Sequence, residues 1–304
     1  MTAEASNKHT LTYRTVRGVD IQLDYVLHER DSGKKLPIVV WFHGGGLLQG
    51  SRRTAPTKYD LCLVSADYRL APQTRLPDIL SDLAHLFSFL TSRAFAAATG
   101  DRLDPDRIVT VGSSAGGWLS LLGGLDIGPR DDDTRDEALA GRVKGVVGIY
   151  PITSVEHEFW HTKQHRKSFP KLVRKVARGQ ADMYCESHNH DDEDRNKMYT
   201  YMIQEGILEQ LLLDGTDVNP SAFTVAKAIA SGRTVEPVPP VYLVHGTADD
   251  KVPHAQSVEV VEALRARGLE CEYEERAGLD HSFDHDEQEE MAPMWEWIVA
   301  KLRE

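Results

Sequence analysis

Cysteine is scarce in this chain, and long apolar runs are missing. The 304 residues include three cysteines, Cys62, Cys185 and Cys271, and their odd number and wide spacing argue against a disulfide framework and favour a reducing compartment. The first ten residues, MTAEASNKHT, contain no apolar stretch, so we expect no signal peptide. No run reaches the length of a membrane span. These absences predict a cytoplasmic protein without a membrane partner.

Positive charge is also in deficit. The chain has 47 acidic residues against 35 lysines and arginines, a formal net charge of -12 at pH 7. This balance argues against nucleic acid or an anionic membrane as the main partner. The length suffices for one large α/β domain with an inserted piece.

The chain is organised around residues 107–123, RIVTVGSSAGGWLSLLG. The β-branched residues at 108–111 predict a strand, and the apolar residues from 118 onward predict a helix. Between them, glycines two positions before and after Ser114 match the nucleophile-elbow pattern, in which a tight turn lifts a serine hydroxyl above a sheet. Ser113 lacks such glycines, so Ser114 is the candidate nucleophile.

Strand patterns alternate with helix patterns along most of the chain. This alternation predicts the α/β class, with a mostly parallel sheet and helices on both faces. The expected strands are 11–16, 21–27, 36–42, 60–66, 108–111, 143–150, 241–244 and 271–275, and the expected helices include 77–90, 254–267 and 293–302.

Residues 152–236 interrupt the alternation. They are rich in charged residues and histidine, contain helix-like pieces at 171–177 and 198–213, and have no convincing strand. We therefore expect a first core part at 1–151, an inserted cap or lid at 152–236 and a second core part at 237–304. Ligands bind at the carboxyl edge of such sheets, so the cap should govern substrate selectivity. Within it, Tyr199, Met202 and Ile207 should pack the cap and in part line the acyl or alcohol pocket.

A serine nucleophile needs a base, and the base needs a carboxylate that fixes its tautomer. The stretch HGTADDKVP at 245–253 offers Asp249 after one predicted strand, and GLDHSF at 278–283 offers His281 after the next. The order serine, acid, histidine is that of the α/β-hydrolase arrangement. Composition alone leaves Asp250 as a rival acid and His245 as a rival base.

Glycines also follow the third predicted strand, in HGGG at 43–46. The backbone amides of Gly44 and Gly45 can point at a carbonyl oxygen because no side chains block the approach, and the amide of Ala115 adds a third donor. Together they form a candidate oxyanion hole. Losing one such donor typically costs about 3 kcal/mol of transition-state stabilisation.

With these motifs the chain resembles the hormone-sensitive-lipase-like carboxylesterases of the α/β-hydrolase superfamily (the alpha/beta hydrolase fold-3 type). The resemblance implies Ser114 as nucleophile, Asp249 as acid and His281 as base. It also implies Gly44, Gly45 and Ala115 as oxyanion donors, a structural role for the HGGG histidine, and no cofactor or metal. The motifs that carry it are HGGG at 43–46, DYRLAP at 67–72, GSSAGG at 112–117, HGTADDKVP at 245–253 and GLDHSF at 278–283.

The acid stretch departs from that group, whose acid usually lies in a D-P-L-x-D sequence. HGTADDKVP is closer to feruloyl-esterase, formamidase and oligopeptidase relatives. In those relatives the H-G-x-x-D spacing from His245 selects Asp249 rather than Asp250. We interpret His245 as a brace for this loop.

The expected activity is hydrolysis of a small-to-medium carboxylic ester through an acyl-enzyme intermediate. An amidase, formamidase or peptidase with the same triad stays open, as does a biosynthetic acyl-transfer or thioester-releasing hydrolase. A non-catalytic ligand-binding protein of this fold is disfavoured because all three triad members are present. The expected partner is a small-molecule acyl substrate. A homodimer is compatible with the sequence, which does not fix the oligomeric state.

Two histidine-rich stretches resemble metal-binding motifs in the spacing of their residues. HEFWH at 157–161 is a literal H-E-x-x-H with His165 beyond it, which on a helix is zinc-ligand spacing. The spacing to His165 is not the extended metzincin pattern, so we interpret the stretch as a solvated or substrate-facing helix surface. Cys185, His188 and His190, before the acidic run 191–194, are interpreted as an exposed loop.

Overall fold

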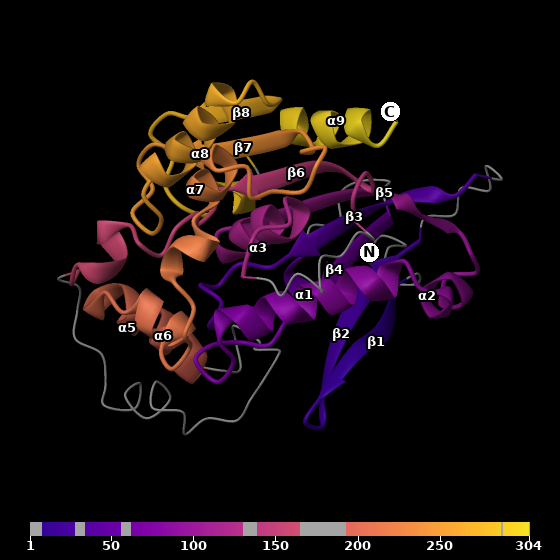
Figure 1. The fold of residues 1–304 in the computed structure, drawn as a ribbon, viewed down its shortest axis with the longest axis horizontal. Helices are drawn as coiled ribbons and strands as arrows, with labels where there is room; N and C mark the ends of the chain where they lie inside the picture. Colours follow the sequence, from indigo (N-terminus) through magenta and orange to yellow (C-terminus); the bar gives the residue numbers. More distant parts are fainter. Residues whose placement is uncertain are drawn as a thin grey trace.

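A single twisted sheet carries the fold (Figure 1). The computed structural model describes residues 8–27, 34–55, 62–129, 139–164, 193–286 and 288–303. Within them the sheet has eight strands in the order β1-β2-β4-β3-β5-β6-β7-β8. The pairs β1–β2 and β2–β4 are antiparallel, and the pairs from β4 through β8 are parallel. The strands are β1 (Lys8–Val16), β2 (Val19–Val26), β3 (Leu36–Phe42), β4 (Cys62–Ala66), β5 (Leu103–Ser113), β6 (Val143–Ile149), β7 (Val241–Gly246) and β8 (Cys271–Arg276).

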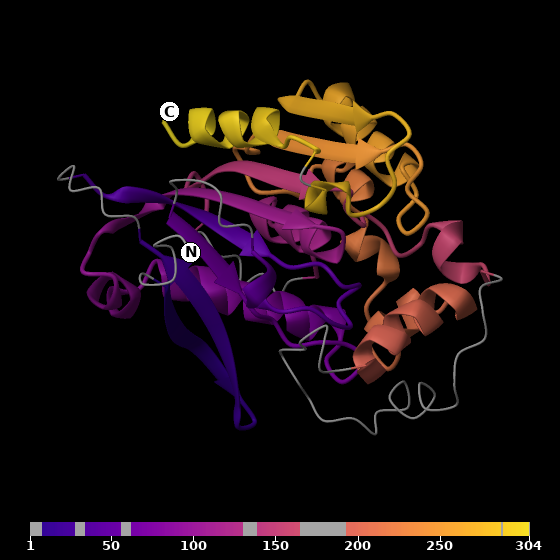
Figure 2. The same cartoon turned by 180° about the vertical axis from the view of Figure 1, so that it is seen from behind.

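Helices cover both faces of this sheet because its central strands are apolar on both sides. Along β3, Ile38 and Val40 pack into the larger core with α1, α3, α7 and α8, whereas Val39 and Trp41 pack into a second core with α9. Figure 2 shows α9 lying along the sheet on this second face. The predicted α/β class is confirmed. The helices are α1 (Leu76–Leu90), α2 (Arg93–Ala98), α3 (Ala115–Gly124), α5 (Glu193–Glu205), α6 (Leu208–Leu213), α7 (Val225–Ala230), α8 (Ala255–Ala266) and α9 (Ala292–Lys301).

Some of the described helices differ from the sequence-based expectation. The short helix α2 was not predicted. The piece expected at 198–213 is two helices, since Gly206 adopts a positive φ of 64° between α5 and α6. The piece expected at 171–177 lies outside the described residues. None of the helices described is long and apolar enough to cross a bilayer.

The helices α5 and α6 lie beside the sheet rather than on either face (Figure 1). The position that a Cβ on Gly46 would take is 2.8 Å from a ring carbon of Tyr199 in α5. Gly46 lies in the turn that follows the carboxyl end of β3 at Phe42, so α5 lies at the carboxyl edge of the parallel strands. Further along the chain, α7 packs against α8, and both helices contribute side chains to the larger core.

Asp82 of α1 ties three segments together from a fully buried position. Its carboxylate accepts hydrogen bonds from Arg14 Nη1 at 2.5 Å and from Arg69 Nε at 2.8 Å, and the Arg69 amide donates to it at 3.1 Å. The side chain of Asp82 is 0% exposed. The antiparallel strand β1, the helix α1 and the loop after β4 therefore share one ionic centre.

Replacing Asp82 with alanine should destabilise the protein by about 3–5 kcal/mol, because two arginines lose a buried partner. Urea unfolding of wild type and variant measures this difference. Asp106→Ala is the matched control. Asp106 pairs with Arg142 with its side chain 69% exposed, so this change should cost less than about 1 kcal/mol. Equal costs for the two variants would contradict a special role for the buried centre.

Candidate active site

Ser114 lies in a strained turn between β5 and α3. Its backbone has φ 56° and ψ −122°, a sparsely populated combination that persists only where surrounding structure enforces it. A Cβ on Gly112 would lie 2.2 Å from the carbonyl oxygen of Gly116, and one on Gly116 would lie 2.1 Å from that of Phe42. Both elbow glycines are thus required by backbone crowding. The Ser114 amide donates to the Ile149 carbonyl at 2.8 Å and holds the turn against β6.

Two of the three predicted oxyanion donors adjoin Ser114. A Cβ on Gly44 would lie 3.4 Å from the Ser114 Cβ, so this glycine packs against the serine. Ala115 is the first residue of α3, where amides have no partner within the helix and can bind an anion. Gly45 follows Gly44 in a tight turn closed by the Leu48 amide, which donates to the Gly45 carbonyl at 3.0 Å.

The loop that contains DYRLAP braces this turn. The Tyr68 ring stacks on His43 with centroids 4.2 Å apart, and the Tyr68 hydroxyl donates to the His43 carbonyl at 2.7 Å. The Ala71 amide donates to the Leu47 carbonyl at 2.8 Å. His43 is buried within these contacts, in keeping with a structural role. The DYRLAP residues therefore hold the HGGG turn beside Ser114.

Asp249 and His281 meet at the same edge of the sheet, after β7 and β8. Asp249 Oδ2 lies 2.7 Å from His281 Nδ1. A carboxylate only accepts hydrogen bonds, so Nδ1 carries the proton and Nε2 carries the lone pair, as a base that acts through Nε2 requires. The other carboxylate oxygen, Oδ1, accepts from the amides of Lys251 at 2.8 Å and Val252 at 2.9 Å.

The Asp249 side chain is fully buried. Burial alone raises the pKa of its carboxyl, but the hydrogen bonds from His245 and His281 outweigh that effect and lower the pKa below the ordinary 3.8. The group is therefore a carboxylate at neutral pH. It can hold the His281 tautomer and stabilise an imidazolium.

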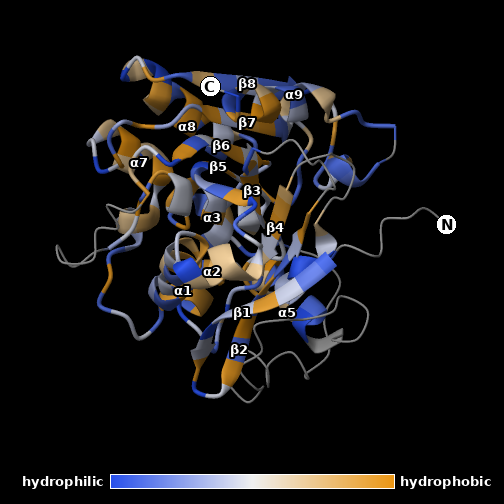
Figure 3. Cartoon of the chain, turned by 90° about the vertical axis from the view of Figure 1, so that its right-hand side faces the viewer, coloured by the Kyte–Doolittle hydropathy of each residue, from blue (hydrophilic) through white to orange (hydrophobic). Residues whose placement is uncertain are grey.

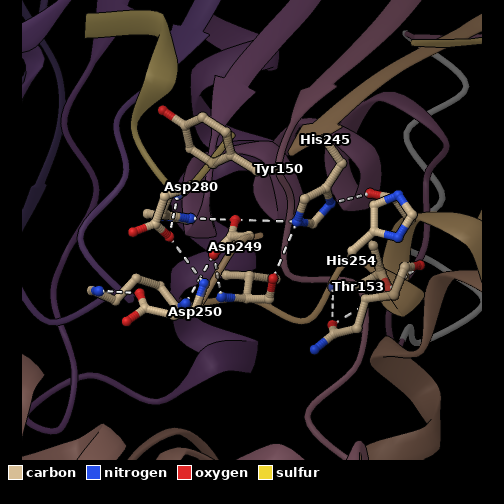
Figure 4. Close-up of polar contacts among 12 residues, drawn as sticks. Tyr150, Thr153, His245, Asp249, Asp250, His254 and Asp280 are labelled. Carbon is tan, nitrogen blue, oxygen red and sulfur yellow. Dashed lines mark hydrogen bonds and ion pairs between the residues drawn. The ribbon is translucent and has the colours of Figure 1, made fainter. Parts of the chain in front are cut away.

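His245 contacts the same oxygen of the Asp249 carboxylate as His281 does, and Figure 4 shows its ring beside Asp249. Its Nε2 lies 3.2 Å from Asp249 Oδ2 and 3.1 Å from the Val252 carbonyl, and its Nδ1 lies 2.7 Å from Ser257 Oγ. Both ring nitrogens are engaged and the side chain is 0% exposed, which agrees with the interpretation of His245 as a brace.

Asp250, the rival acid, belongs to a different set of contacts. Its carboxylate pairs with Lys251, and its amide donates to Asp280 Oδ1 at 3.1 Å. Of the two adjacent carboxylates, Asp249 is the one that the structure brings together with His281.

Tyr150 is a site residue that the sequence did not single out. Its ring lies 4.3 Å from that of His281, and its hydroxyl donates to Asp284. Burial, followed by the charge of Asp284, raises the Tyr150 pKa well above 10.0, so the phenol stays neutral and serves as packing for the imidazole. The only signal in the sequence was a bulky residue at the end of a predicted strand.

The H-E-x-x-H stretch does not have the α-helical geometry that zinc-ligand spacing requires. Residues Glu158–His161 form a 3-10 helix instead. His157 accepts a hydrogen bond from the Phe159 amide, and His161 Nε2 lies 3.0 Å from the Val155 carbonyl. No group of three or more metal-ligating side chains occurs in the part of the chain that the structure describes. His165, Cys185, His188 and His190 lie outside it.

Comparisons with known families match both halves of the chain. The BD-FAE family model matches residues 23–187, just over half of the sequence. The prolyl oligopeptidase family model matches residues 196–304, which include the HGTADDKVP stretch. This second match agrees with the expectation that the acid loop is close to that of oligopeptidase relatives.

Individual relatives are more distant. The chain is 24% identical to the non-reducing polyketide synthase Preu6 of Preussia isomera, over 90% of this chain and 14% of the synthase. It is 29% identical to esterase LipC of Mycobacterium tuberculosis, over 83% of this chain and 54% of LipC. The chain thus spans a small part of the synthase and about half of LipC.

Solved structures show the same fold. The native esterase 2 of Thermogutta terrifontis aligns with a TM-score of 0.63 at 21% identity, covering 97% of this chain and 90% of the esterase. Its sarin-phosphonylated form aligns with a TM-score of 0.64 at 19% identity, covering 98% and 93%. From the family match and the fold together, the chain belongs to the BD-FAE family and has the α/β-hydrolase fold.

Proposed function

We propose that this protein hydrolyses a small-to-medium carboxylic ester through an acyl-enzyme on Ser114. His281 acts as the base, Asp249 fixes and stabilises it, and the amides of Gly44, Gly45 and Ala115 bind the oxyanion. The observation that carries the proposal is the 2.7 Å contact between Asp249 and His281 at the sheet edge that also carries the strained Ser114.

The reaction follows from these groups in two stages. His281 Nε2 takes the Ser114 hydroxyl proton as Oγ attacks the ester carbonyl, and the oxyanion forms against the backbone amides. The intermediate collapses when the alcohol leaves with the proton from His281. A water then gives a proton to His281 as it attacks the acyl-enzyme carbonyl. The second intermediate collapses when Ser114 Oγ leaves with that proton from His281, which releases the carboxylic acid and restores the Ser114 hydroxyl.

We also propose that residues 152–236 act as a cap that selects the substrate, between core parts at 1–151 and 237–304. Tyr199 and Met202 of α5 support this role, because both approach Gly46 of the HGGG turn. Short acyl groups are the first substrates to examine. Esterase 2 of T. terrifontis has been solved with propionate and with butyrate bound.

The test is turnover of p-nitrophenyl acetate, butyrate and octanoate by wild type and Ser114→Ala in parallel. We expect turnover that requires Ser114, with a chain-length trend that reports the size of the acyl pocket. Labelling of wild type by a fluorophosphonate gives an independent measure of the nucleophile. Ester turnover that survives in Ser114→Ala at the wild-type rate would contradict the proposal.

Acyl release from a thioester is the second candidate. The observation in its favour is the match of 90% of this chain to a segment of polyketide synthases, and the same triad can attack a thioester carbonyl. The two candidates separate when butyryl N-acetylcysteamine is compared with the matched ethyl ester. A higher kcat/KM for the thioester, beyond its greater intrinsic reactivity, would favour acyl release.

A further inference from the structure

One face of α5 is buried against the core of the fold. Arg195, Tyr199 and Met202 lie four and then three residues apart on this helix, so they share one side. Arg195 is 1% exposed and Met202 is 0% exposed. Because Tyr199 and Met202 approach Gly46, this face covers the turn that carries HGGG.

The Arg195 guanidinium bridges two loops at the carboxyl edge of the sheet. Its Nη1 donates to the Leu48 carbonyl at 2.8 Å and to the Ala71 carbonyl at 3.2 Å, and its Nη2 donates to Gln73 Oε1 at 3.2 Å. A buried guanidinium is costly unless its N–H groups are bonded. These acceptors therefore fix α5 at the meeting point of the HGGG turn and the DYRLAP loop.

Backbone hydrogen bonds connect the carbonyl acceptors of Arg195 to the proposed oxyanion hole. The Leu48 amide donates to the Gly45 carbonyl at 3.0 Å, and the Ala71 amide donates to the Leu47 carbonyl at 2.8 Å. Arg195 thus holds the end of this short turn at Leu48. Gly44, at the other end of the turn, packs against Ser114. Oxyanion donors stabilise a transition state only when they are held at hydrogen-bond distance from the developing charge.

We propose that Arg195 is a positioning residue that holds the oxyanion turn through the Leu48 carbonyl and so makes catalysis depend on the docking of α5. The proposal rests on the function proposed above. Arg195 acts through the backbone rather than on the substrate. Its loss should therefore lower kcat, the quantity sensitive to transition-state stabilisation, and leave KM nearly unchanged.

Arg75 provides a matched control. Its Nη1 donates to the carbonyls of Gln210 at 3.2 Å and Leu211 at 2.6 Å in α6. This is the same kind of contact between an arginine and backbone carbonyls across the boundary of the proposed cap. It involves neither the HGGG turn nor residues 67–72. Comparing the two arginines separates the positioning of the turn from general attachment of the cap.

The experiment measures kcat and KM for p-nitrophenyl butyrate, the rate of fluorophosphonate labelling, and Tm. The variants, made in the 304-residue chain, are Arg195→Met, Arg195→Gln, Arg195→Lys and Arg75→Met. For Arg195→Met we expect a fall in kcat and labelling rate on the order of 10- to 100-fold, with KM within about threefold. Arg195→Lys should recover part of the loss, since an ammonium still donates to carbonyls. Arg75→Met should stay within about threefold of wild type.

Wild-type kcat in a folded Arg195→Met variant would overturn the inference. So would equal losses in Arg195→Met and Arg75→Met, or a loss confined to KM. If Arg195→Met does not fold, Arg195→Gln carries the test, because a shorter, neutral amide cannot replace the guanidinium that donates to both carbonyls. A wild-type kcat in a folded Arg195→Gln variant would overturn the inference. A wild-type protein that neither hydrolyses esters nor reacts with the fluorophosphonate would instead overturn the proposed function, and the inference with it.

Discussion

Replacing Ser114 with alanine should lower kcat/KM for p-nitrophenyl butyrate by about 10⁴- to 10⁶-fold. The substitution removes the one atom that forms the acyl-enzyme, so neither His281 nor the oxyanion amides can compensate. Residual activity should resemble water attack assisted by binding alone. Steady-state kinetics at protein concentrations high enough to detect that residual rate measures the effect.

The fold should survive this substitution. Alanine has the same Cβ as serine, so it meets the same strain at φ 56°, and the Tm of Ser114→Ala should stay close to that of wild type. Ser113→Ala is the matched control, because Ser113 is the neighbouring serine in the same turn and carries no proposed chemistry. A loss in Ser113→Ala as large as that in Ser114→Ala would contradict the assignment of the nucleophile.

A third variant tests the strain itself. Glycine tolerates positive φ, whereas a residue with a side chain in such a region costs on the order of 1–3 kcal/mol. Ser114→Gly should therefore unfold at a higher denaturant concentration than Ser114→Ala, although both are inactive. A lower midpoint for Ser114→Gly would mean that the elbow is not strained.

Local sequence patterns predicted the strands well, and they failed where contacts between distant segments decide. The apolar run LPIVVWF appears as β3 with its predicted bounds, because a strand buried on both faces leaves a continuous signal. The helical period of 198–213 gave no sign that Gly206 would adopt a positive φ and divide the piece. Such a choice depends on what surrounds the glycine, here the backbone at His161 and Thr162.

In the candidate active site, too, local sequence patterns predict some features, and contacts between distant segments decide the others. Ser114, Asp249 and His281 each follow a strand, and all parallel strands end at one edge, so sequence order suffices to bring them to that edge. The packing of Tyr150 on His281 and the bonds of Arg195 to Leu48 and Ala71 carry no local signature. They become visible only when the loops are assembled.

Replacing Asp249 with asparagine should lower kcat by about 10⁴-fold while the protein stays folded. In the wild-type protein the Asp249 carboxylate accepts hydrogen bonds from two backbone amides, His281 and His245. An asparagine side chain has one oxygen and a donating NH₂ group. If the oxygen keeps the two backbone bonds, the NH₂ group faces His281 and selects the tautomer with its lone pair on Nδ1, which leaves Nε2 unable to take the serine proton.

Asp250→Asn is the control, and it should keep activity within about threefold of wild type because Asp250 pairs with Lys251.

The pH dependence of stability gives a second readout for Asp249. The pKa of Asp249 is lowered by folding from its ordinary 3.8, so the carboxylate contributes stability above that pH and loses it as the pH falls. The free energy of unfolding of wild type minus that of Asp249→Asn should therefore decrease below about pH 4. A difference that stays constant, together with normal kcat in Asp249→Asn, would transfer the role of the acid to another residue.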